Sequence, residues 1–83
     1  MSADLMIMYS TPWCGYCHRL IKQLERAGVA YSTVDIEADA DAARFVEGIN
    51  GGNQTVPTVV LPDGEALTNP PIGLVLARLG RTA

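Results

Sequence analysis

The chain has 83 residues, of which 48% are hydrophobic and 18% charged, so we expect residues 1–83 to fold as a single domain. Six Lys and Arg residues against nine Asp and Glu residues give a formal net charge of −3, which argues against nucleic acid as a partner. No apolar run approaches the ~20 residues that span a bilayer, and residues 1–4 (Met-Ser-Ala-Asp) do not resemble a secretory signal. A cytoplasmic protein without membrane contact is expected.

The first predicted elements are a strand and a helix. Leu5–Ser10 is a nearly continuous apolar run, as expected of a central strand that is covered on both faces. From Cys14 onward, apolar residues recur at intervals of three and four as far as Leu24, which predicts a helix. Gly28 is placed to close that helix.

A second strand and helix follow. Ala30–Ile36 alternates and is rich in β-branched residues, which favours a strand. Asp39 is the expected N-cap of a helix over roughly Ala40–Ile49. We predict that Phe45 and Val46 of this helix belong to the core.

A hairpin and a last helix complete the chain. Thr58–Leu61 predicts a strand, and residues 62–64 (Pro-Asp-Gly) predict a turn into a short strand over Glu65–Thr68. Asn69 is the expected N-cap of the last helix, with Pro70 in its first turn. The predicted order is βαβαββα, an α/β fold with a small mixed sheet and flanking helices.

Cys14 and Cys17 form a Cys-x-x-Cys pair where the first strand ends and the first helix begins. Free N–H groups and the positive end of the helix dipole favour a thiolate at Cys14, whereas Cys17, one turn inside, is more enclosed. Cys14 is therefore the predicted nucleophile and Cys17 the predicted resolving cysteine. In a cytosolic chain with only two cysteines this pattern is typical of redox catalysis or metal binding rather than of a disulfide scaffold.

The same residues match other Cys-based sites less well. Together with His18 they fit the Cys-x-x-Cys-His pattern of covalent haem attachment, but the chain has no His or Met after His18 to serve as a distal ligand. A zinc site lacks a second pair of ligands. No metal site within one chain is predicted, and a cluster shared between two chains stays open.

Three segments together resemble the glutaredoxins, and more specifically the mycoredoxins. They are residues 13–17 (Trp-Cys-Gly-Tyr-Cys), residues 54–58 (Gln-Thr-Val-Pro-Thr), and Asp63-Gly64 followed by residues 67–70 (Leu-Thr-Asn-Pro). The resemblance spans nearly the whole chain. It implies a thioredoxin-like fold, with a four-stranded mixed sheet flanked by three helices.

The resemblance also implies an activity. Mycoredoxins are cytosolic enzymes that reduce mixed disulfides between proteins and mycothiol, a low-molecular-weight thiol used by some bacteria in place of glutathione. The expected partners are therefore mycothiol and mycothiolated proteins. Mycothiol is a co-substrate and no cofactor is bound, while NADPH supplies electrons through mycothiol disulfide reductase. A monomer is expected.

The resemblance further suggests which residues contact the substrate. In the resembled fold the Val56–Pro57 bond is cis and faces the sulfur of Cys14, so the Val56 backbone is offered to a bound disulfide partner. Neutral hydroxyl and amide groups beside the thiol suit a sugar better than a charged tripeptide, so we expect mycothiol to be preferred over glutathione. The predicted substrate-binding residues are Trp13, Tyr16, Val56, Pro57, Thr58, Thr68 and Asn69.

Alternatives remain at several of these positions. Trp13 and Tyr16 either grip the partner or shield the helix start. His18 is expected to be a solvated or packed helix residue, with a general-base role as the alternative. Arg19 and Lys22 are expected on a solvated face, with a positive potential near Cys14 as the alternative. An electron donor for ribonucleotide reductase is a rival within the fold, although the Trp-Ser-Gly-Phe-Arg-like C-terminal motif of those proteins is absent. An iron–sulfur carrier is the rival from another class, because Gly15 stands where glutaredoxins commonly have Pro.

Overall fold

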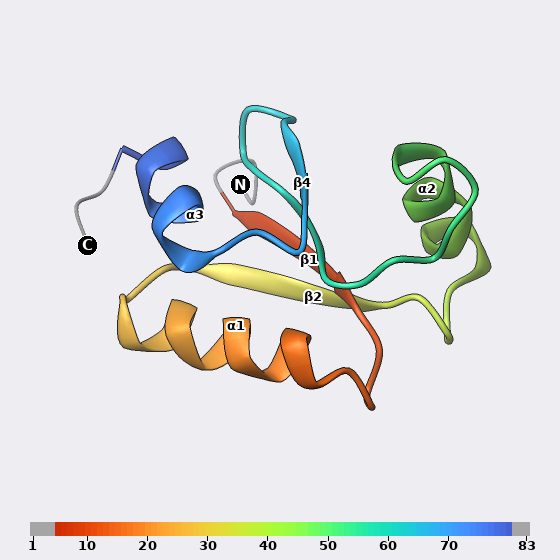
Figure 1. The fold of residues 1–83 in the computed structure, drawn as a ribbon, viewed down its shortest axis with the longest axis horizontal. Helices are drawn as coiled ribbons and strands as arrows, with labels where there is room; N and C mark the ends of the chain where they lie inside the picture. Colours follow the sequence, from red (N-terminus) through yellow and green to blue (C-terminus); the bar gives the residue numbers. More distant parts are fainter. Residues whose placement is uncertain (1–4, 81–83) are drawn as a thin grey trace.

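The structure, a computed structural model, describes residues 5–80 and confirms the predicted element order (Figure 1). The strands are β1 (Met6–Ser10), β2 (Tyr31–Asp35), β3 (Thr58–Val60) and β4 (Ala66–Thr68), and the helices are α1 (Gly15–Arg26), α2 (Ala40–Ile49) and α3 (Ile72–Arg78). Within residues 5–80, no helix has both the length and the apolar character that crossing a membrane requires.

The four strands form one mixed sheet in the order β2-β1-β3-β4. β1 is central, as predicted, and runs parallel to β2 and antiparallel to β3, which in turn pairs antiparallel with β4. Tyr9 is paired with Thr58, so the C-terminal end of β1 lies beside the N-terminal end of β3. The segment that leads to Cys14 and the segment that precedes Thr58 therefore meet at one edge of the sheet.

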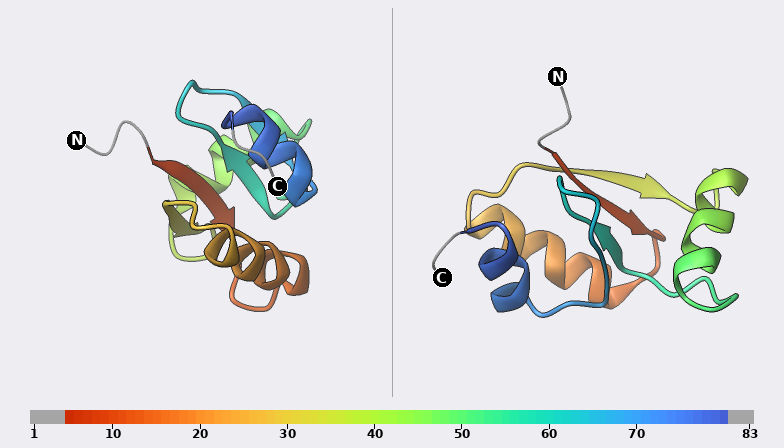
Figure 2. Two further views of the ribbon diagram at one scale, coloured as in Figure 1. Left: turned by 90° about the vertical axis from the view of Figure 1, so that its left-hand side faces the viewer. Right: turned by 90° about the horizontal axis from the view of Figure 1, so that it is seen from above.

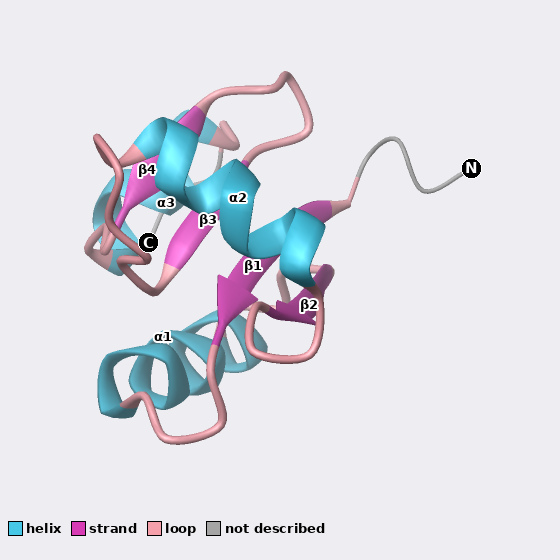
Figure 3. Ribbon diagram, turned by 90° about the vertical axis from the view of Figure 1, so that its right-hand side faces the viewer, coloured by secondary structure: helices cyan, strands magenta, loops and turns pink. Residues whose placement is uncertain are grey.

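Helices cover both faces of the sheet, with α1 and α3 on one side and α2 on the other (Figures 2 and 3). Side chains alternate between the faces of a strand, so Met6 and Met8 of β1 point toward α1 and α3, whereas Tyr9 packs on the α2 side. The larger core therefore lies on the same face as the two cysteines. Its buried residues are Met6, Met8, Cys14, Cys17, Leu20, Leu24, Val29, Val59, Leu61, Val75 and Leu76.

Phe45 does not belong to the core, contrary to the prediction. Its side chain is 44% exposed and packs at the surface against Tyr9, with ring centroids 5.1 Å apart. Val46 is fully buried at the centre of the inner face of α2, and Phe45, which points about 100° away from it, lies at the edge of that face. Ala42 and Ala43 fill the remaining inner face.

The last helix also starts later than predicted. Asn69 is not its N-cap: α3 begins at Ile72, and Pro71 occupies the N-cap position without a side-chain hydrogen bond. Asn69 has a φ of +45°, and its backbone amide donates a hydrogen bond to the carbonyl oxygen of Pro57 at 2.7 Å. That bond ties Asn69 to the residue before β3 instead of to the helix.

Candidate active site

Cys14 is the N-cap of α1, and its Sγ accepts a hydrogen bond from the backbone amide of Cys17 at 3.1 Å. The sulfur thus takes the place of the side-chain oxygen that most N-caps use. A donated N–H and the positive end of a helix both stabilise negative charge. The structure therefore places Sγ of Cys14 at the start of α1, the position that the sequence predicted, and both cysteines are free thiols.

Cys17 lies one turn inside the helix and is only 1% exposed. Burial, followed by a hydrogen bond to Cys14 and the charge of Cys14, raises the pKa of the Cys17 thiol to about 12, while the Thr11 backbone acts in the opposite direction. Cys17 is therefore a protonated thiol at neutral pH. Cys17 is thus the more enclosed of the two cysteines, as predicted, and its thiol is the one that burial holds in the protonated form.

The loop before β3 faces the sulfur of Cys14. The Val56–Pro57 peptide bond is cis, as the resemblance implied, and the Cys14 thiol donates to the carbonyl oxygen of Val56 at 3.8 Å. Val56 is half-buried whereas Pro57 is buried. The backbone of Val56 is thus the part of this loop that borders the reactive sulfur.

Two aromatic side chains flank Cys14 at the surface. Trp13 is 70% exposed and Tyr16 is 62% exposed, so both are available to a partner. The indole Nε1 of Trp13 donates a hydrogen bond to Oε2 of Glu37 at 2.6 Å. Glu37 was not singled out in the sequence, although β2 runs parallel to β1 and the residues just after two parallel neighbours emerge at the same edge.

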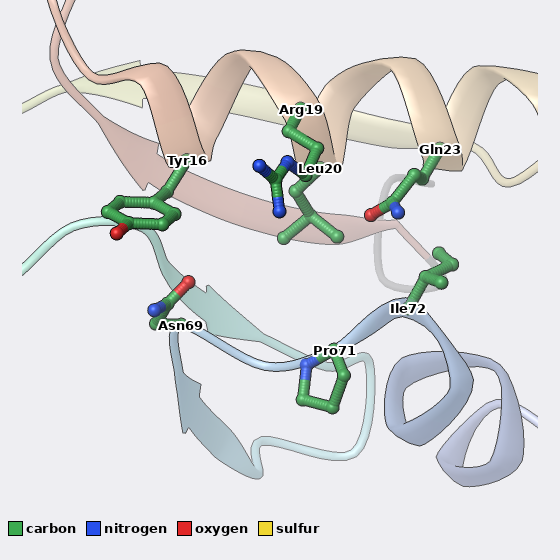
Figure 4. Close-up of a pocket in the computed structure, with 7 residues that line it drawn as sticks. All are labelled: Tyr16, Arg19, Leu20, Gln23, Asn69, Pro71 and Ile72. Carbon is green, nitrogen blue, oxygen red and sulfur yellow. The ribbon is translucent and has the colours of Figure 1, made fainter.

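A groove of about 320 Å³ lies between α1 and the segment that joins β4 to α3 (Figure 4). Tyr16 and Asn69 lie opposite each other at one end, and Arg19 projects into the middle from α1. Arg19 is exposed, as expected of a solvated face, and it also lines this groove. The full lining is Tyr16, Arg19, Leu20, Gln23, Asn69, Pro71 and Ile72.

Thr58 and Thr68, both predicted to contact substrate, are both hydrogen-bonded to Asn50. Thr58 is fully buried, and its hydroxyl donates to the carbonyl oxygen of Thr55 at 2.8 Å and accepts from Nδ2 of Asn50 at 3.1 Å. The hydroxyl of Thr68 donates to Oδ1 of Asn50 at 2.7 Å. The Thr58 side chain is therefore not exposed to a ligand, contrary to the expectation; its hydrogen bonds stabilise the start of β3 instead. Thr68 stays exposed, with its proton committed to Asn50.

His18 contacts the loop that precedes the cysteines. Its Nε2 lies 2.8 Å from the carbonyl oxygen of Pro12, and because a carbonyl only accepts, this nitrogen carries the proton. His18 therefore anchors the Pro12 end of the loop. Within residues 5–80, no group of three or more His, Cys, Asp or Glu side chains is placed to hold a metal ion.

Comparisons with known proteins agree with this geometry. The glutaredoxin family model matches residues 6–67. A protein of Mycobacterium tuberculosis with the provisional name glutaredoxin is 50% identical over 83 residues, which cover 100% of this chain and 99% of that protein. Mycoredoxin 1 of Corynebacterium glutamicum is 40% identical over 72 residues, or 87% of this chain and 89% of the relative. The glutaredoxin structure from Methanosarcina mazei has the same fold, with a TM-score of 0.78 at 23% identity over 94% of this chain and 80% of that one.

Proposed function

Because the chain belongs to the glutaredoxin family, we propose that this thiol oxidoreductase reduces mixed disulfides between mycothiol and protein cysteines. One observation supports this reaction most directly: Sγ of Cys14 accepts the Cys17 amide at a helix N-terminus and lies beside the Val56 backbone. Similarity to Mycoredoxin 1 over 87% of the chain supports mycothiol as the small thiol. The protein acts as a cytoplasmic monomer in this proposal.

In the first step the Cys14 thiolate attacks the mycothiol sulfur of the mixed disulfide. The bond between mycothiol and the protein sulfur breaks, and the protein sulfur leaves as a thiolate that takes a proton from solvent. A disulfide between Cys14 and mycothiol remains. The Cys17 amide, which donates to Cys14 at 3.1 Å, stabilises the attacking thiolate before this step and stabilises Cys14 again when it later leaves.

In the second step Cys14 is released by another thiol. A second mycothiol thiolate attacks the bound mycothiol sulfur, which forms mycothiol disulfide and frees the Cys14 thiolate. Cys17 offers an intramolecular route, in which its thiolate attacks Sγ of Cys14 and releases mycothiol. Burial raises the pKa of the Cys17 thiol and so disfavours this route at neutral pH, and mycothiol is the resolving thiol in our proposal. Mycothiol disulfide is then reduced at the expense of NADPH by mycothiol disulfide reductase.

The substrate is held by groups around the sulfur. The Val56 backbone pairs with the extended chain next to the disulfide in the manner of an added strand. Tyr16 and Asn69, which face each other across the groove, contact the hydroxyls and amides of mycothiol, and Thr68 adds an exposed hydroxyl oxygen as an acceptor. Trp13 covers the disulfide from the other side. No bound cofactor takes part.

The test is reduction of one protein substrate that carries either mycothiol or glutathione in the same mixed disulfide. We expect kcat/KM for the mycothiol form to be higher by about a hundredfold, which corresponds to ~3 kcal/mol of differential binding in the transition state. Comparable values for the two thiols would contradict mycothiol specificity while leaving the family's thiol–disulfide exchange intact. As a second readout, mass spectrometry of a Cys17→Ser variant should detect the mixed disulfide between Cys14 and mycothiol.

A further inference from the structure

The groove at Tyr16 continues along α1 away from the reactive cysteine. A second hollow of about 240 Å³ is lined by Gln23, Arg26, Ala27, Ile72 and Leu76, and it shares Gln23 and Ile72 with the first. We call the two together the α1–α3 trough; its first part is drawn in Figure 4. The trough runs from Tyr16, two residues after Cys14, to Arg26.

Among residues 5–80, the charged side chains that line the trough are all cationic, in a chain whose formal net charge is −3. They are Arg19 and Arg26, both exposed. Within residues 5–80 the ion pairs involve Arg44 with Asp41 and Arg78 with Glu65, which leaves both trough arginines without a carboxylate partner. The opposite side of the trough offers no acid, because residues 66–80 contain none.

The length of the trough and the different chemistry of its two sides suit an extended polypeptide segment. Tyr16 and Arg26 are ten positions apart in α1, about 15 Å along the helix, which is the span of four or five extended residues. One side carries the two guanidinium groups and the amide of Gln23, and the other is apolar through Pro71 and Ile72. Alternate side chains of an extended segment point in opposite directions and so meet the two sides separately.

We propose that the α1–α3 trough, beyond the Tyr16 and Asn69 end that mycothiol occupies in the proposed function, binds an extended acidic segment of the protein substrate. Asp or Glu side chains of that segment pair with Arg19 and Arg26, and the alternating apolar side chains lie against Ile72. This inference rests on the proposed function only in that the substrate is a disulfide-bonded protein. It adds a preference for the sequence around the substrate cysteine.

The experiment compares two peptide substrates that carry the same mycothiol mixed disulfide. One has Asp and Glu at alternate positions beside the cysteine, and the other has Asn and Gln at those positions. We expect the wild-type protein to favour the acidic peptide by about fivefold in kcat/KM at low ionic strength, with a smaller preference at high salt. The Arg19→Gln/Arg26→Gln double variant is expected to lose this preference, so that its acidic-to-neutral ratio falls to about one.

Lys22→Gln is the matched control, because Lys22 is an exposed cation of the same helix that does not line the trough. It should keep the preference. Equal kcat/KM for the two peptides in the wild-type protein, or a preference that survives in the double variant, would overturn the proposal. A wild-type protein that reduces neither peptide but reduces bis(2-hydroxyethyl) disulfide would instead refute the proposed function, so the two failures are distinguishable.

Discussion

The backbone amide of Cys17 donates a hydrogen bond to Sγ of Cys14 at 3.1 Å, while the thiol of Cys17 is turned into the core and is 1% exposed. Cys17 thus supports Cys14 through its main chain, and that support does not depend on the identity of its side chain. The contributions of the two cysteine side chains to activity can therefore be measured separately by substituting each in turn.

We expect Cys14→Ser to abolish reduction of a mycothiol mixed disulfide and Cys17→Ser to retain most of it. The serine at position 17 keeps the amide that stabilises the Cys14 thiolate, and mycothiol replaces the buried thiol in the second step. Steady-state kcat/KM of both variants checks this. Equal loss in both would show that the disulfide between the two cysteines is obligatory.

The raised pKa of Cys17 also predicts how stability depends on pH. The thiol binds its proton more tightly in the folded chain, with a pKa of about 12 against an ordinary value of 9.0, so protonation favours folding. This stabilisation is fully present below pH 9 and is lost as the pH rises from 9 toward 12. Urea unfolding of the reduced protein should show a steeper fall between pH 9 and 11 for the wild type than for Cys17→Ser. Parallel curves would contradict the assigned cause.

The hydrogen bonds of Asn50 with Thr58 and Thr68 should stabilise the fold at the start of β3. Thr58→Val keeps the shape of the side chain but leaves the Thr55 carbonyl and the Asn50 amide without their partner, so we expect a loss of about 1–3 kcal/mol in the free energy of unfolding. Thr68 is exposed, and Thr68→Val should cost less. Thr33→Val, at an exposed strand position, is the control. If Thr58→Val is no more destabilising than this control, the assigned role of Thr58 is wrong.

The hydrogen bond between Trp13 and Glu37 should hold the indole beside the reactive sulfur. Glu37→Ala removes the acceptor, whereas Glu37→Gln keeps one. We expect KM for the mixed disulfide to rise about two- to tenfold in Glu37→Ala, as the loss of one hydrogen bond implies, and to change little in Glu37→Gln. Trp13 is the only tryptophan, so its fluorescence emission reports the change directly. An unchanged KM in Glu37→Ala would leave the bond without a role in binding.

The element order and the unequal cysteines were predictable because they follow from local patterns. Three- and four-residue spacing up to Leu24 predicts a helix, and a thiol at the first turn of any helix meets free amides. The start of α3 was less predictable, because Asn69 serves equally well as an N-cap or as a left-handed residue. The choice is made by its bond to Pro57, a residue of another segment.

The rest of the site depends on which distant side chains meet. Thr58 reads as a free hydroxyl in the sequence, and only the pairing of β3 with β1 and β4 turns it inward to Asn50. Glu37 lies 24 residues from Trp13 in the chain. Arg19 has a solvated helical pattern, and the approach of the segment before α3 makes it part of a groove. These outcomes belong to tertiary structure, which overrides local preference.

The contact between Cys14 and the Val56 carbonyl joins residues that are 42 positions apart, and this has a consequence during synthesis on the ribosome. Both cysteines are synthesised long before β3. At a synthesis rate of ~5–20 residues per second, the loop that carries Val56 follows roughly 2–8 seconds after Cys14. In that interval the thiols lack the enclosure that β3 and α3 complete. The nascent chain is therefore the form of the protein in which this cysteine pair is most open to cellular oxidants.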